Sequence, residues 1–194
     1  MNSTPPKWFT KSLEVKKTEH SIKVDGANIN YQKWGNEKNP GLLLVHGSGS
    51  HSHWWDFIAP SFLDLFEVVA IDLSGMGESD HRKEYKAEIF ANEILSVAKD
   101  ANLFRDRSKP PVICGHSLGG FMSAAAGSLS KELIRGVIMI DSPIRPPDYD
   151  YSQHMHSYPI RRRKTYPTLE SILERFILSL TIILLLKVLS PANV

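Results

Sequence analysis

The sequence has almost no cysteine and no excess of charge of one sign. Its single cysteine among 194 residues, Cys114, excludes an internal disulfide and a cysteine-rich zinc site. The 23 lysines and arginines nearly balance the 21 aspartates and glutamates, leaving a formal charge of +2. Such a balance provides no basic field for nucleic acid. The lone cysteine favours a reducing, cytoplasmic compartment.

Long hydrophobic runs are also absent. Residues 1–6 lack the charged-then-apolar pattern of a secretory signal. Residues 176–186 form an uncharged, mostly apolar stretch of eleven residues, whereas a bilayer span needs roughly 20. We therefore expect the end of a helix there rather than a transmembrane segment, with contact of this tail with a membrane as the alternative.

Four short runs are apolar throughout instead of alternating with polar residues. This pattern is typical of strands buried on both faces of a parallel sheet. The runs are Leu42–Val45, Val68–Ile71, Pro111–Cys114 and Val137–Ile140. Before them, Asp25-Gly26 separates two alternating segments and predicts a β-hairpin.

Between these runs, apolar residues recur at helical spacing. It predicts helices within residues 54–62, 89–98 and 118–129, with Trp54 and Trp55 in the core. Alternation of strand and helix predicts an α/β fold with a mostly parallel, doubly wound sheet. We assign residues 1–142 to the core of this fold. Residues 143–176 are interpreted as the start of a lid and residues 177–194 as an atypical apolar tail.

The strongest chemical signal is a G-x-S-x-G motif at residues 115–119, directly after a predicted strand and before a predicted helix. A serine at such a sharp turn is presented above the sheet at a helix N-terminus, where developing negative charge is favoured. Ser117 is therefore the candidate nucleophile. Cys114, at the end of the buried strand, is expected to be inert.

A second candidate element is the loop His46-Gly47-Ser48-Gly49-Ser50, which ends the first apolar run. Glycine-rich loops can direct backbone N–H groups at an oxyanion, and acyl transfer needs two such donors. The expected pair is the N–H of Ser48 and that of Leu118. His46 is interpreted as a structural histidine that hydrogen-bonds the loop backbone.

With these motifs the chain resembles the α/β-hydrolase superfamily, in its single-domain esterase, lipase and haloperoxidase-like branch. Three blocks stand in the family's order, at residues 46–50, 72–80 and 115–120. The middle block is similar to the D-x-x-G-x-G-x-S loop that lies beside the family's active site. The resemblance implies a serine hydrolase with a small-molecule substrate and neither metal nor organic cofactor.

The family's catalytic histidine has no match at its usual place. In the family the order is serine, acid, histidine, and only His154 and His156 follow Ser117. Either could substitute as the base, although both fall in the irregular segment. Asp141 ends the strand after the nucleophile helix, and it is either the acid or a structural residue. We therefore expect a chain that lacks the family's last two strands, as a frameshifted or truncated product would.

The sequence predicts a serine hydrolase acting on a small ester or a related acyl substrate, with little turnover by this chain itself. The alternative is a non-catalytic protein that docks a partner or membrane through its apolar tail.

Overall fold

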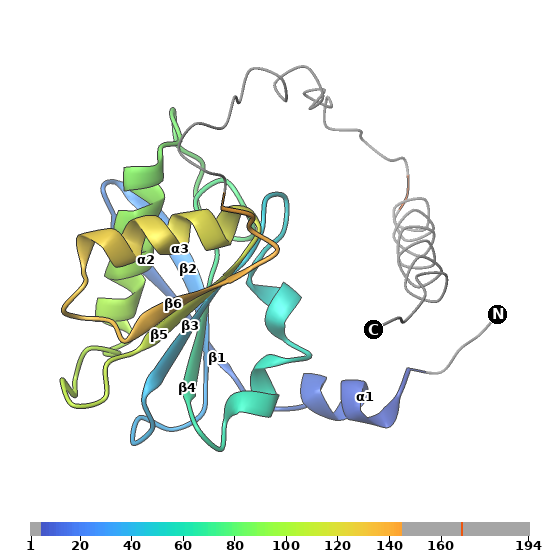
Figure 1. Cartoon of the computed structure of the whole chain (residues 1–194). Coiled ribbons are helices and arrows are strands. Elements are labelled where there is room, and N and C mark those ends of the chain that lie inside the picture. The colour runs from blue at the N-terminus through green and yellow to red at the C-terminus, as the bar shows by residue number, and fades with distance from the viewer. Residues whose placement is uncertain (1–4, 145–167, 169–194) are drawn as a thin grey trace, which may run out of the picture. The chain divides into compact units, whose positions relative to one another are not determined.

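The structure is a computed structural model that describes residues 5–144 and residue 168 (Figure 1). Two units are separated between Ile144 and Arg145, and the description below concerns the first. Most of the expected lid and the whole expected tail lie outside the described residues. None of the described helices is long and apolar enough to cross a bilayer.

One six-stranded sheet, in the order β1-β2-β4-β3-β5-β6, organises the described residues. Strands β1 to β4 pair antiparallel at β1–β2 and β2–β4 and parallel at β3–β4. Strands β5 and β6 extend the parallel part beyond β3. The predicted mostly parallel sheet is confirmed. The strand bounds are β1 Thr18–Val24, β2 Ala27–Trp34, β3 Gly41–Val45, β4 Glu67–Ile71, β5 Val112–His116 and β6 Gly136–Ile140.

Each face of the sheet has its own apolar cluster. Helices α2 (Ala87–Asp100) and α3 (Leu118–Leu129) lie over one face, as Figure 1 shows. They bury side chains such as Phe90, Ile94 and Ala126 against the strands. On the other face, Trp34 and Trp55 pack with Leu44 and Ala70. Burial of apolar area on both faces explains why these strands are apolar throughout.

The helix predicted within residues 54–62 is wrong. The structure has two 3₁₀ helices there, η1 (Ser52–Trp55) and η2 (Ala59–Phe62). Pro60 has no N–H to donate to a carbonyl one turn back, so an α-helix cannot run through this segment. Trp55 is buried as expected, but Trp54 is 46% exposed. Helix α1 (Lys7–Leu13) is not predicted by the sequence patterns above.

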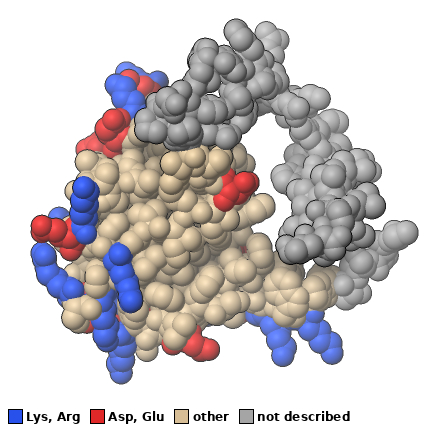
Figure 2. All heavy atoms as spheres, viewed as in Figure 1, with Lys and Arg blue, Asp and Glu red and all other residues tan. Residues whose placement is uncertain are grey.

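Basic and acidic side chains are mixed on the face of the molecule that Figure 2 shows. In the view of Figure 2 they intersperse along the left edge, with uncharged surface between them. The near balance of charges in the sequence therefore also holds locally on this face. Inside the protein, the buried Glu67 carboxylate is paired with Lys33 at 2.8 Å and Arg105 at 2.6 Å.

Candidate active site

Ser117 lies at the turn between β5 and α3. Its backbone has φ 51° and ψ −119°, a conformation that non-glycine residues seldom adopt. The surroundings hold this strained turn in place. The Ser117 N–H donates to the Ile140 carbonyl at 2.8 Å, and the Ser142 hydroxyl donates to the Ser117 carbonyl at 2.8 Å. The tertiary structure therefore imposes the sharp strand-to-helix turn.

The glycines of the motif allow neighbouring backbone segments to pack closely against each other. A Cβ on Gly115 would lie 2.6 Å from the Gly120 nitrogen, and one on Gly119 would lie 2.5 Å from the Val45 carbonyl oxygen. Real Cβ contacts are longer than 3.0 Å. Any side chain at these two positions would push α3 away from the sheet and displace Ser117.

The loop of residues 46–50 lies against the candidate nucleophile. A Cβ built on Gly47 would be 3.3 Å from the Ser117 Cβ, which places the two backbones side by side. Gly49 has φ 70°, a left-handed conformation that glycine adopts without cost. Within residues 5–144 and 168, neither the Ser48 N–H nor the Leu118 N–H donates to a protein acceptor. Both donors are left for another acceptor.

His46 is a buried part of the scaffold. Its Nδ1 lies 2.8 Å from the Gly47 carbonyl, to which it donates, and its Nε2 accepts from the Leu73 N–H at 3.1 Å. These two bonds require the neutral ring. Burial lowers the pKa of His46, although the Gly47 hydrogen bond partly opposes this effect. The structure agrees with the structural role expected for this histidine.

Asp72 connects the loop after β4 to the segment that follows the Gly47 loop. Its carboxylate accepts from the Ser52 N–H at 2.6 Å and from the Glu78 N–H at 3.0 Å. Ser79 Oγ donates to the Asp72 carbonyl at 2.7 Å. Gly77 has φ 56°, and a Cβ there would collide with the Asp72 carboxylate. The D-x-x-G-x-G-x-S block therefore sets the geometry of its own loop.

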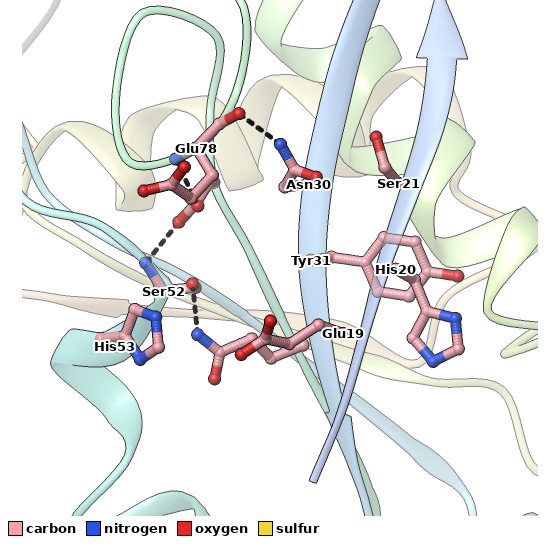
Figure 3. A pocket seen from close by; sticks show the side chains of 10 residues that line it. Glu19, His20, Ser21, Asn30, Tyr31, Ser52, His53 and Glu78 are labelled. Atoms are coloured by element: carbon pink, nitrogen blue, oxygen red, sulfur yellow. Dashed lines mark hydrogen bonds between the residues drawn. The ribbon is translucent and has the colours of Figure 1, made fainter.

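A cavity of about 250 Å³ lies beside this connection, between β1, β2, η1 and the loop after Asp72 (Figure 3). Figure 3 shows Glu19 and His20 of β1 on one side and Glu78 on the other. Ser117 does not line this cavity. The cavity is consequently separate from the nucleophile.

Asp141 and His116 lie at the carboxyl ends of the strands, on the same side of the molecule as Ser117. The Asp141 side chain is 84% exposed, and its Oδ2 is 3.9 Å from His116 Nε2, too far for a hydrogen bond. The His116 ring stacks on Trp54 with centroids 6.1 Å apart. The proximity of Asp141 to Ser117 follows from the Ile140 hydrogen bond, but its role as acid stays a prediction.

Sequence reasoning missed two supports of the site. Ser142 carried no recognisable signal, because only the fold brings its hydroxyl under Ser117. Glu93 could have been noticed as a charged residue inside the apolar stripe of α2. It is fully buried, pairs with Arg82 at 2.7 Å and accepts from the Ser74 N–H at 3.0 Å.

Two further candidates of the sequence are not placed. His154 and His156 lie outside the described residues. Among the residues that the structure describes, no group of three or more His, Cys, Asp or Glu side chains could hold a metal ion.

Comparisons with known proteins agree with this architecture. A family model described as alpha/beta hydrolase fold matches residues 40–178, more than half of the chain. The chain therefore belongs to the α/β hydrolase fold family. Within that family it is similar to hydrolases of several kinds.

Among curated relatives, epoxide hydrolase 3 of Xenopus tropicalis is 26% identical over 67% of this chain and 35% of its own length. Pyrrolizixenacetamide deacetylase of Xenorhabdus hominickii is 31% identical over 62% of this chain and 44% of its own. A solved membrane phospholipase A is 26% identical, with a TM-score of 0.64 over 78% of this chain and 48% of that one. The chain spans less than half the length of these relatives.

Proposed function

We propose that this chain carries the nucleophile and oxyanion donors of a serine hydrolase that cleaves a small carboxylic ester or a related acyl substrate. The observation that carries the proposal is the strained turn at Ser117, with φ 51°, between β5 and α3. Backbone strain of this kind lowers the stability of the fold, so it is found mainly where a functional site requires it. Similarity to a deacetylase and to a phospholipase supports acyl chemistry.

In the proposed reaction the Ser117 Oγ attacks the carbonyl carbon of the substrate. The carbonyl oxygen becomes an anion, which accepts from the N–H groups of Ser48 and Leu118. Loss of one such donor typically costs about 3 kcal/mol of transition-state stabilisation. Collapse of the tetrahedral intermediate breaks the ester C–O bond, and the leaving alcohol takes the proton that the base removed from Ser117. Water then hydrolyses the acyl-serine to the carboxylic acid and free Ser117.

The proton of the Ser117 hydroxyl needs a base, and none is assigned among the described residues. His46 is not that base, because both of its ring nitrogens are already engaged by the backbone. Asp141 is the proposed acid, since it lies, like Ser117, at the carboxyl end of a strand of the sheet. His154 or His156 remains the candidate base.

Covalent labelling of the whole chain with a fluorophosphonate tests the nucleophile. We expect labelling of Ser117 that disappears in Ser117→Ala. The matched control is Ser128→Ala, which removes an exposed hydroxyl from the same helix. Labelling that survives Ser117→Ala would show that another residue reacts. Absence of labelling in both the unmodified chain and the control favours the non-catalytic alternative.

A further inference from the structure

One sign of charge dominates the lining of the cavity beside β1 and β2, which has a volume of about 250 Å³. Three carboxylates line it, those of Glu19, Asp72 and Glu78, and the lining contains neither lysine nor arginine. Figure 3 shows Glu19 and Glu78 on opposite sides. At about 30 Å³ per water molecule, the volume corresponds to about eight waters. The cavity therefore has the size and the charge of a site for a small cation.

Asp72 is the buried member of this group of carboxylates. It is 3% exposed, and its carboxylate accepts from the backbone N–H groups of Ser52 and Glu78, which are both uncharged donors. Within residues 5–144 and 168, none of the three carboxylates forms an ion pair. A buried carboxylate is ordinarily paired with a cation. The negative charge of the lining is thus left for a bound cation to balance.

The two histidines of the lining are already engaged by other groups. His20 Nε2 lies 2.8 Å from the Thr18 hydroxyl oxygen, and the ring stacks on Tyr31 with centroids 5.0 Å apart. His53 Nδ1 lies 2.8 Å from a carboxylate oxygen of Asp56, which does not line the cavity. A positive charge on His53 would therefore be balanced by Asp56 rather than by the carboxylates of the lining.

Gln32 provides a second, independent indication of a ligand. Its side chain lines the cavity and is 3% exposed, and its Nε2 donates to the Ser52 hydroxyl oxygen at 2.8 Å. Its Oε1 is buried and has no hydrogen-bond partner in the part of the chain that the structure describes. Leaving a buried carbonyl oxygen without a donor is unfavourable. A donor bound in the cavity would remove this penalty.

An organic cation fits this arrangement better than a metal ion. A metal ion requires several ligands that converge on one point, and no group of three His, Cys, Asp or Glu side chains among the described residues does so. The Tyr31 hydroxyl donates to Asp100, outside the lining, at 2.6 Å. This leaves the Tyr31 ring for a ligand. Ammonium groups and their alkyl chains both pack favourably on aromatic and apolar surfaces.

We propose that the cavity binds a small organic cation, namely a primary ammonium group on a short alkyl chain. An ammonium group has three N–H donors and no acceptor, which matches a lining of carboxylates and the amide oxygen of Gln32. The alkyl chain packs against the Tyr31 ring. Because Ser117 does not line the cavity, this binding is separate from the proposed hydrolysis.

Nuclear magnetic resonance titration of the whole chain with butylammonium chloride tests the proposal. The backbone N–H groups of Ser52 and Glu78 are the reporters, because both donate to Asp72. We expect their signals to shift saturably with butylammonium and not with butan-1-ol, which has the same alkyl chain without the charge. Calcium chloride should give no saturable shift. High salt should weaken the binding, because it screens the charges.

Four variants locate the binding. Glu19→Gln removes one exposed charge of the lining and should weaken butylammonium binding about threefold. Adding Glu78→Gln should raise the loss to about tenfold, since the two effects multiply. Gln32→Met keeps the side chain's length without its amide oxygen and should weaken binding about fivefold. The matched control is Glu132→Gln, which removes the same charge from an exposed residue outside the lining and should leave the dissociation constant unchanged.

Four results would overturn the proposal. The first is the absence of a saturable shift at Ser52 and Glu78 with butylammonium, including the case in which calcium chloride shifts them instead. The second is an equal response to butan-1-ol. The third is unchanged affinity in a folded Gln32→Met variant. The fourth is a loss of affinity in Glu132→Gln as large as in Glu19→Gln, as expected for attraction to the whole surface. None of these measurements involves hydrolysis, so they are independent of the proposed function.

Discussion

Replacing Gly119 by alanine tests whether close packing of α3 on the sheet holds the Ser117 turn. The new Cβ would lie 2.5 Å from the Val45 carbonyl oxygen and would also collide with the His46 carbonyl. Ordinary contact begins at 3.4 Å, so α3 and β3 would have to separate by about 0.9 Å. Neither neighbour is a side chain that can rotate away.

The expected loss of stability is at the upper end of overpacking effects, about 3 kcal/mol. Urea unfolding followed by tryptophan fluorescence measures it, and the midpoint should fall by about 1–2 M. Gly136→Ala is the matched control, because a Cβ on Gly136 meets nothing within 4 Å and its φ is not positive. That variant should be unchanged or up to about 1 kcal/mol more stable.

The two variants should also differ in reactivity. A displaced α3 moves the Leu118 N–H and the Ser117 hydroxyl together, so Gly119→Ala should lose fluorophosphonate labelling where Gly136→Ala keeps it. Equal urea midpoints for Gly119→Ala and Gly136→Ala would refute the packing argument. The strained turn would then have to be held by something other than the contact between α3 and β3.

Two other predictions concern buried ionisable groups. Glu93→Ala removes the carboxylate that pairs with Arg82 and accepts from the Ser74 N–H. Urea unfolding should show a loss of about 3 kcal/mol, because the arginine keeps its charge without a carboxylate and only its hydrogen bonds to the Val24 and Asp25 carbonyls remain. Burial lowers the pKa of His46 below its usual 6.5. Below pH 6.5 the unfolded chain therefore binds a proton at His46 that the folded chain does not bind. The free energy of unfolding should fall as the pH drops below 6.5, by at most about 1.4 kcal/mol per pH unit. In His46→Gln this part of the pH dependence, measured between pH 7 and 5, should disappear; an unchanged slope contradicts the assignment of His46 as a buried neutral ring.

The predicted strands were recovered because their signal is local. Leu42–Val45 and Val68–Ile71 are apolar throughout, and burial on both faces requires this of each strand separately. Val137–Ile140 is also apolar throughout and forms a strand, although Ile138 and Ile140 are exposed. The strand ending at Cys114 in the prediction continues to His116, because His116 still pairs with Ile140. Local composition does not reveal how far such pairing extends.

The same contrast applies to the helices. Residues 118–129 form the predicted helix without a change of bounds. Residues 54–62 carry a helical spacing of apolar residues, yet Pro60 interrupts the backbone hydrogen bonds there. The spacing of apolar residues indicates which side chains are buried. The helix type that buries them depends on which backbone hydrogen bonds can form.

By itself the sequence determined the α/β fold, the place of Ser117 between a strand and a helix, and the glycines that this turn requires. These features depend on neighbours a few residues apart, so a linear motif contains them. Only the tertiary structure decided that Ser142 supports the Ser117 carbonyl, that His116 stacks on Trp54, and that the Ser117 N–H donates to the Ile140 carbonyl of β6. Those relations follow from the strand order β2-β4-β3-β5-β6, in which crossovers bring together residues that no short stretch of sequence connects.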